Sequence, residues 1–313
     1  MNAARRDFIA GAFFILLAAS GWGLLGPVAR LAFAEGLSPL EVAFWRAVQG
    51  GVFFGLHAVL VGRRHVQRQD LPGVLLFALI GGVIFFAAYQ MAVDAGGASL
   101  AAVLLYTAPV WVVLGSALFL KEPVTTVKTL AVAATLLGVV LIASGANGAR
   151  YSLIAIILGL VSGFSYASYY LFGKLYFERY SAASVYAVVF PVAALGLFPW
   201  VSFSTKTSTA VAALLILGIA STYLPYLFYA LGLRRMDASR ASVIATTEPV
   251  IAATIAHLWW GERFSTAGYA GALLVLFAVV VMVLSGLRRR PKISPRETGS
   301  DPAELAAPDR GPP

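Results

Sequence analysis

The sequence predicts an all-α polytopic membrane protein with ten transmembrane helices, arranged as two inverted five-helix repeats. Three observations support this fold class. The 313 residues are 60% hydrophobic and only 12% charged, whereas globular domains carry about 25% charged residues. Uncharged stretches of membrane-spanning length recur along the chain, and one segment of the first half reappears in similar form in the second half.

Ten apolar segments are long enough to span a bilayer. A helix needs about 20 apolar residues to cross a hydrocarbon core of about 30 Å. Two of the segments carry charges, 40–62 with Glu41 and Arg46, and 241–261 with Glu248. A soluble fold would have to bury the eight uncharged segments inside one core with almost no polar faces, so we do not expect one. The eight uncharged stretches are 8–29, 71–93, 95–120, 129–149, 151–173, 180–205, 207–233 and 264–287.

The positive charges are distributed unevenly between the loops. If the N-terminus lies inside, the cytoplasmic segments hold sixteen Lys and Arg residues and the opposite side holds three, apart from Arg30 and Arg46 near span ends. This bias follows the positive-inside rule and places both termini in the cytoplasm. The net charge of +9 is therefore explained by membrane topology and by attraction to anionic headgroups of the lipid bilayer. No nucleic-acid partner is expected.

The chain ends and the rare residue types exclude several other classes. The apolar stretch 8–29 follows Arg5 and Arg6, as the hydrophobic region of a signal peptide follows its basic residues. It is longer than such a region, so we retain it as the first span. The absence of cysteine excludes disulfides and thiolate sites. His57 and His257 have no acid at ligand spacing, and we expect neither metal nor cofactor. The proline-rich residues 288–313 predict a disordered cytoplasmic tail.

The chain contains an internal repeat. Residues 98–122 (ASLAAVLLYTAPVWVVLGSALFLKE) align with residues 238–262 (ASRASVIATTEPVIAATIAHLWWGE), with nine of 25 positions identical. We call the spacing that aligns Ala98 with Ala238 the repeat offset. Weaker matches join SGWG at 20–23 to SGFS at 162–165 and EGLS at 35–38 to ERYS at 178–181. We therefore divide the chain into repeats at 1–145 and 151–287.

The two repeats must have opposite orientations, because each contains five spans and five is odd. Glu122 then ends a span on the cytoplasmic side, and its equivalent Glu262 ends one on the outer side. Inverted repeats related by an axis in the membrane plane are typical of alternating-access transporters.

These features resemble the drug/metabolite transporter superfamily, specifically the EamA type. The motifs that carry the resemblance are AGGASLAAVLLYTAPV ending in KE, MDASRASVIATTEPV ending in GE, and SPLEVAFWR at 38–46. The resemblance implies a central cavity lined by the first four spans of each half, with the fifth spans at the periphery and often at homodimer contacts. It also implies a multi-pass protein of the bacterial inner membrane, and similar proteins export amino acids, aromatic ones among them, and other metabolites or drugs.

Substrate contacts should come from polar and aromatic side chains that face inward, because polar groups facing lipid are costly. The repeat offset pairs Tyr89 with Tyr229, and Tyr223 shares a helix face with Tyr226 at a spacing of three. The alternatives are anchoring at headgroup level for the tyrosines and helix packing for Trp22. The candidate substrate-binding residues are Trp22, Tyr89, Gln90, Tyr106, Thr107, Tyr166, Tyr170, Tyr223, Tyr226, Thr247 and Glu248.

Two prolines lie near the middle of equivalent spans. Pro109 and Pro249 lack a backbone donor and free the carbonyls of Leu105 and Ala245. We expect a hinge or local unwinding at each, which either exposes backbone to substrate or produces a plain kink without ligand contact.

Glu248 has no counterpart in the first half, where Ala108 occupies the equivalent position. A carboxylate at membrane depth must be protonated, paired or facing water. Three roles remain open: a proton carrier for antiport, a counter-charge for a substrate ammonium, or a structural partner of a cation such as Arg46.

Other functional classes lack their signatures. The sequence contains no GxSxG or HExxH motif and no paired membrane aspartates, which would indicate an enzyme. It also contains no mid-span lysine, which a retinal protein would need, and no filter loop, which would indicate a channel. We therefore expect a secondary transporter of small-molecule organic solutes, exporting amino acids or related metabolites by alternating access. The alternative is a proton-coupled exporter of multiple drugs or cationic compounds.

Overall fold

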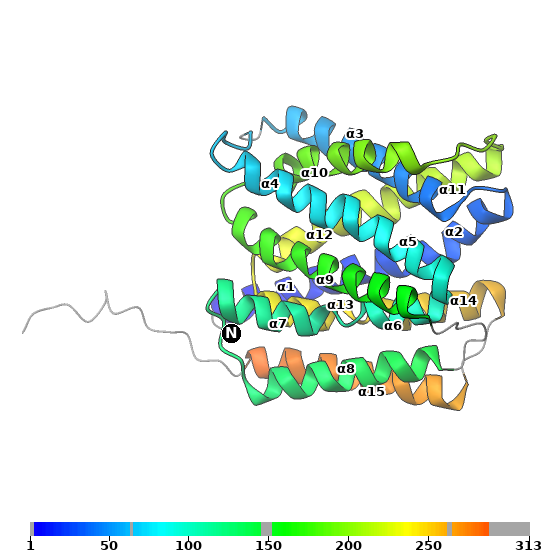
Figure 1. Ribbon diagram of the computed structural model, residues 1–313. Helices are drawn as coiled ribbons and strands as arrows, with labels where there is room; N and C mark the ends of the chain where they lie inside the picture. Colours follow the sequence, from blue (N-terminus) through cyan, green and yellow to red (C-terminus); the bar gives the residue numbers. More distant parts are fainter. Residues whose placement is uncertain (1–2, 63–64, 145–151, 262–264, 288–313) are drawn as a thin grey trace, which may run out of the picture.

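The computed structural model describes residues 3–62, 65–144, 152–261 and 265–287, and these form a bundle of roughly parallel helices (Figure 1). The predicted tail 288–313, Glu262 and the repeat boundary near 145–151 lie outside the described residues. The helices of the first half are α1 (Ala3–Gly23), α2 (Leu25–Ala34), α3 (Pro39–Leu60), α4 (Leu71–Phe77), the π-helix η1 (Ala78–Ile84), α5 (Phe85–Gly96), α6 (Ala98–Leu105), α7 (Ala108–Phe119) and α8 (Thr126–Ala143).

The second half has the same order of spans, but its first span is one continuous helix. Its helices are α9 (Leu153–Tyr176), α10 (Ala182–Leu197), the short 3-10 helix η2 (Phe198–Trp200), α11 (Ser208–Gly218), the π-helix η3 (Ile219–Tyr223), α12 (Leu224–Leu233), α13 (Ala238–Ala245), α14 (Glu248–Trp260) and α15 (Thr266–Leu287). Within the described ranges, nine helical stretches are long and apolar enough to cross a membrane by length and composition. The tenth predicted span is α3, which has 22 residues and carries Glu41 and Arg46.

Four of the ten spans are interrupted at equivalent places in the two halves. The fourth and ninth spans break at Tyr106–Thr107 and Thr246–Thr247, just before Pro109 and Pro249. The third and eighth spans each pass through a π-helical segment, η1 and η3, which overlap under the repeat offset. The breaks were predicted from the prolines, but the π-helical segments were not. π-helical turns are rare and are frequent at functional sites.

Helix packing follows the repeat. The second spans of the two halves, α3 and α10, pack together, as do the fifth spans, α8 and α15. α1 packs on α12, and the equivalent pair α9 and α5 packs in the same way. In Figure 1, α8 and α15 form a layer along the lower side of the bundle. The bundle is thus built from corresponding elements of two repeats, as the inverted arrangement requires.

The equivalent helices α3 and α10 also begin with the same N-cap. Ser38 accepts a hydrogen bond from the backbone amide of Glu41 at 3.1 Å, and Ser181 accepts one from the amide of Ser184 at 3.1 Å. These caps satisfy donors that each helix start leaves free. The weak sequence match between 35–38 and 178–181 therefore marks the start of a helix in both repeats.

On the predicted cytoplasmic side, the start of α13 is tied to the first repeat. Glu122 accepts hydrogen bonds from the backbone amides of Ala238 at 2.7 Å and Ser239 at 3.3 Å. Lys128 pairs with Glu122 at 3.2 Å and with Asp237 at 3.4 Å. A carboxylate at a helix N-terminus is stabilised by the helix dipole, so this contact holds the two repeats together at that end.

Candidate central cavity

A cavity of about 490 Å³ lies between the two repeats. Its walls come from α1, α2, α3, α5, α6, α9, α12 and α14 and the residues just after α6. Gly26 and Arg30 are exposed at its rim, and α2, which carries them, lies at the end predicted to face outward. The cavity therefore opens toward the predicted outer side. Pockets for small organic ligands measure about 300–1,000 Å³.

Trp22 is placed in the cavity wall by close helix contacts on both sides of it. A Cβ at Gly21 would lie 2.6 Å from the carbonyl oxygen of Ala220, and a Cβ at Gly23 would lie 2.8 Å from Cγ2 of Ile251. Only glycine allows these helices to approach so closely. The indole is 8% exposed and packs against the rings of cavity residues Tyr166 and Tyr226.

Glu248 enters the cavity through the break in the ninth span. Pro249 cannot donate to the preceding turn, and the hydroxyl of Thr247 donates to the carbonyl of Ile244 at 2.9 Å. α14 then restarts at Glu248, which occupies its first turn. The partial positive charge of a helix N-terminus favours a carboxylate there. This break accounts for an acid at membrane depth and aims it at the cavity.

Glu248 shares the cavity with an arginine. Tyr106, Arg46 and Glu248 all line this cavity, and both Tyr106 and Arg46 are near enough to the Glu248 carboxyl to interact with it electrostatically. Arg46 is only 7% exposed and also lines the cavity. The lining of the cavity therefore carries an acid, a cation and several phenol rings.

Arg46 is oriented by the π-helical segment of the second half. Its Nε donates to Thr222 Oγ1 at 3.0 Å, and one terminal nitrogen donates to the carbonyl of Ser221 at 3.2 Å. The guanidinium also lies 5.7 Å from the ring centroid of Phe86. These bonds use Nε and one terminal nitrogen, while the guanidinium carries five donors. Donors therefore remain for a ligand in the cavity.

The structure places most of the predicted site residues on the cavity wall. These are Trp22, Tyr89, Gln90, Tyr106, Tyr166, Tyr226, Glu248 and the hinge residue Pro249. The other hinge residue, Pro109, is buried next to Tyr106. Placement on the wall shows access to the cavity, and the role of each residue in substrate binding stays a prediction.

Four predicted residues lie elsewhere. The hydroxyls of Thr107 and Thr247 donate to carbonyls of the preceding turn, as expected where a helix breaks. Tyr170 is 1% exposed and packs deeper, against Tyr229. Tyr223 lies 2.9 Å from His57 Nδ1.

The prediction that Tyr223 and Tyr226 share a helix face stays a prediction, and of the two only Tyr226 lines the cavity. The spacing argument assumes 3.6 residues per turn. The π-helical segment η3 ends at Tyr223 and α12 begins at Leu224, so this assumption holds between Tyr223 and Tyr226. The two rings pack on the stacked rings of Phe54 and Phe190, while the Tyr223 hydroxyl lies 2.9 Å from Nδ1 of His57.

Arg46 is the main cavity residue missing from the predicted site. Its signal was present, because an arginine in a span normally faces the protein interior. One partner also had a signal, because Pro225 of α12 lacks the N–H that would bond the carbonyl of Ser221 in a regular helix. Nothing in residues 219–223 marks the π-helical turn itself. Phe85 and Phe86, which follow η1, are also cavity residues that the prediction did not include.

Comparison with known proteins agrees with this architecture. The model of the EamA-like transporter family matches residues 9–144 and 153–284. The chain belongs to the EamA-like transporter family. It is a multi-pass membrane protein of the drug/metabolite transporter superfamily, as the motifs predicted.

Individual relatives cover nearly all of the chain. An uncharacterized transporter from Archaeoglobus fulgidus is 26% identical over 86% of this chain and 97% of its own length. YdfC, an uncharacterized transporter from Bacillus subtilis, is 30% identical over 78% and 82%. A probable terminal-alkyne amino-acid exporter from Streptantibioticus cattleyicolor is 24% identical over 90% and 95%. A crystal structure at 19% identity superimposes with a TM-score of 0.77, covering 90% of this chain and 98% of that one, and shows the same fold.

Proposed function

We propose that this EamA-family protein exports amino acids or closely related metabolites by alternating access. The observation that carries the proposal is the presence of Arg46 and Glu248 in the lining of one cavity. A zwitterionic substrate would place its carboxylate against the Arg46 guanidinium and its ammonium against the Glu248 carboxylate. Charge-assisted hydrogen bonds of this kind are about twice as strong as neutral ones.

The aromatic residues of the wall suit the rest of such a substrate. Trp22, Tyr89, Tyr106, Tyr166 and Tyr226 offer ring faces together with indole and phenol donors. Ring faces also attract an ammonium group. These contacts accommodate apolar and aromatic side chains, which agrees with the similarity to the probable terminal-alkyne amino-acid exporter from Streptantibioticus cattleyicolor.

The alternative is a proton-coupled exporter of cationic compounds. Glu248 among aromatic rings supports it, because a cation needs only an acid and ring faces. Arg46 argues against it, since a buried guanidinium in the same cavity repels a cation that has no carboxylate. We place the protein in a bacterial inner membrane, with both termini in the cytoplasm and the cavity open to the outside.

The test is counterflow into proteoliposomes of purified protein. A panel of amino acids and a panel of cationic dyes are compared, each with and without a pH gradient. We expect saturable counterflow of amino acids. Transport of the dyes alone, driven by the gradient, would instead establish the alternative function.

Two matched substitutions distinguish a specific role of Glu248 from the general effect of removing one acidic side chain. Glu248→Gln should raise the KM for amino acids at least about tenfold, because a charge-assisted hydrogen bond is lost. The matched control is Glu178→Gln, whose side chain is 63% exposed at the predicted cytoplasmic end of α9. It should leave KM unchanged. An unaltered KM in Glu248→Gln would remove Glu248 from the binding site.

A further inference from the structure

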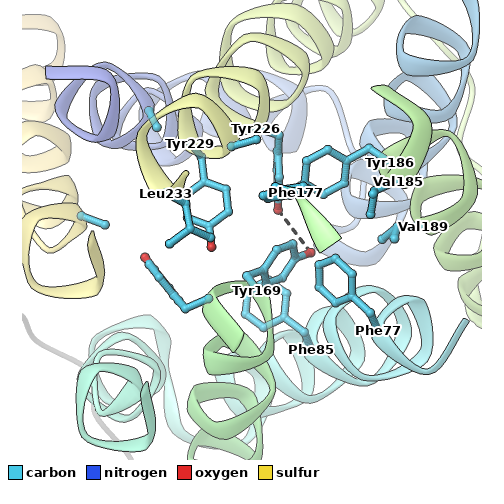
Figure 2. Close-up of a cluster of buried hydrophobic side chains, with 14 of the residues drawn as sticks. Phe77, Phe85, Tyr169, Phe177, Val185, Tyr186, Val189, Tyr226, Tyr229 and Leu233 are labelled. Atoms are coloured by element: carbon cyan, nitrogen blue, oxygen red, sulfur yellow. Dashed lines mark hydrogen bonds between the residues drawn. The ribbon is translucent and has the colours of Figure 1, made fainter. Parts of the chain in front are cut away.

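Below the cavity, toward the predicted cytoplasmic side, lies a closed cluster of tyrosines. Figure 2 shows Tyr169, Tyr186, Tyr226 and Tyr229 converging from α9, α10 and α12. Tyr226 donates to Tyr169 at 3.3 Å, and Tyr169 donates to the carbonyl of Gly81 in η1 at 2.8 Å. These two hydroxyls are therefore satisfied within the protein.

The hydroxyls of Tyr186 and Tyr229 have no hydrogen-bond partner among the described residues, although both side chains are 0% exposed. Buried polar groups in native proteins are nearly always paired, so an unpaired one requires an explanation. Tyr186 and Tyr229 lie about one turn from the predicted cytoplasmic ends of α10 and α12. The hydroxyl of Tyr170, which packs on Tyr229, is unpaired as well within the described part of the chain. Unpaired hydroxyls gathered in one cluster point to a partner that is present in another state.

The repeat relates this cluster to the open cavity. Tyr229 is equivalent to Tyr89 under the repeat offset, and Tyr226 is equivalent to Phe86. Both Tyr89 and Phe86 line the cavity on the predicted outer side. Because the second repeat is inverted, the equivalent of an outer wall residue should lie on the wall of the inner half of the pathway.

The cluster is closed at both ends in this structure. Trp22 and Tyr226, which both line the cavity, separate the rest of the cluster from it. The ring centroid of Trp22 lies 5.4 Å from that of Tyr226 and 5.6 Å from that of Tyr229. Toward the predicted cytoplasm it is covered by Phe177 and Leu233, which are 1% and 0% exposed. The Glu122 contact with the start of α13 lies at this same end.

We propose that Tyr186 and Tyr229 line the inner half of the substrate pathway, and that their hydroxyls bind the polar groups of the passing substrate when this half is open. The inference rests on alternating access, and it does not depend on which solute is carried. It assigns Trp22 as the barrier between the outer cavity and the inner half. It also makes Leu233 the residue that the opening would expose to the cytoplasm.

Thiol labelling tests the opening directly, because the chain contains no cysteine and any introduced thiol is unique. Leu233→Cys is compared with Ala278→Cys, a residue 1% exposed in a separate cluster with residues of α8 and α13. A membrane-impermeant maleimide is applied to inside-out vesicles. If the inward-open state holds about 1% of the molecules, Leu233→Cys should react at least about tenfold faster than Ala278→Cys.

Equal labelling rates, or reaction of Leu233→Cys only from the outer side, would overturn the proposal. A second arm tests the unpaired hydroxyls by thermal unfolding. Tyr186→Phe and Tyr229→Phe should keep or raise the Tm, while Tyr169→Phe should lower it because a paired hydroxyl is lost. A lower Tm in Tyr186→Phe and Tyr229→Phe would show that these hydroxyls already have partners, and would contradict the proposal.

These outcomes are separable from those of the counterflow panel. Cytoplasmic labelling of Leu233→Cys without amino-acid counterflow would support the inner pathway and refute the proposal that amino acids are the substrate. Amino-acid counterflow without labelling of Leu233→Cys would leave the substrate in place and move the inner pathway elsewhere.

Discussion

At the scale of single residues, Arg46 and Glu248 reach the cavity through two different departures from a regular helix. Glu248 begins α14 after a proline-directed break, and Arg46 is held by the π-helical segment that carries Ser221 and Thr222. In both cases the irregular backbone supplies the polar partner that a membrane interior lacks. The charged pair is therefore a product of local backbone geometry.

Substituting Arg46 by lysine tests this geometry without removing the charge. Lysine has no planar fork of donors and cannot hold Thr222, Ser221 and a carboxylate at once. We expect Arg46→Lys to raise the KM for amino acids about tenfold, measured by counterflow. Arg68→Lys, at an exposed position between α3 and α4, is the control and should transport normally. A wild-type KM in Arg46→Lys would mean that the guanidinium does not bind the substrate.

The sequence predicted Glu248 better than Arg46, and the reason is local. Glu248 lies directly before Pro249, and the ninth span aligns with the fourth span in the sequence. The break in the ninth span could therefore be predicted from the residues themselves. The partners of Arg46 lie in the other half of the chain, in a segment whose letters, IASTY, give no sign of a π-helical turn.

At the scale of elements, the fifth spans pack through glycine. A Cβ at Gly271 of α15 would lie 2.4 Å from the carbonyl oxygen of Gly138 in α8, and a Cβ at Gly138 would lie 2.8 Å from that of Gly271. Small residues that let backbones approach are typical of helix contacts in membranes. The contact joins the two repeats on the side opposite α3 and α10 (Figure 1).

Adding one methyl group at this contact should destabilise the protein. Gly271→Ala must separate α8 from α15, and overpacking of this kind costs about 1–3 kcal/mol. The Tm in detergent should fall. Gly55→Ala is the matched control, because a Cβ there meets nothing within 4 Å and alanine favours a helix over glycine. An unchanged Tm in Gly271→Ala would show that the two helices are not packed this closely.

Span lengths and the order of elements were predictable from hydrophobicity, since the bilayer fixes how many apolar residues a helix needs. The proline-marked breaks were predictable as well. The break between α1 and α2 at Leu24 and the two π-helical segments were not predicted, although Pro27 and Pro225 lack the N–H that would bond the carbonyls of Gly23 and Ser221. The segment η1 contains no proline, and its interruption depends on neighbouring helices. Gly81 of η1, for example, accepts its hydrogen bond from Tyr169 of α9.

At the scale of the whole molecule, the two inverted repeats form an asymmetric pair of half-pathways. The outer half is a cavity of about 490 Å³, and the inner half is a packed cluster of aromatic rings (Figure 2). Inverted repeats can exchange such conformations, which opens one side while closing the other. The residue pair Tyr89 and Tyr229 marks equivalent positions in the open and the closed half.

The central claim is that the cavity selects a molecule carrying both an ammonium and a carboxylate. The most direct measurement is counterflow of three compounds that share one side chain: the best amino acid of the panel, its decarboxylated amine and its deaminated acid. We predict efficient transport of the amino acid and at least about tenfold weaker transport of both analogues, because each leaves one buried charge without its partner. Transport of the amine as efficient as that of the amino acid would contradict the claim.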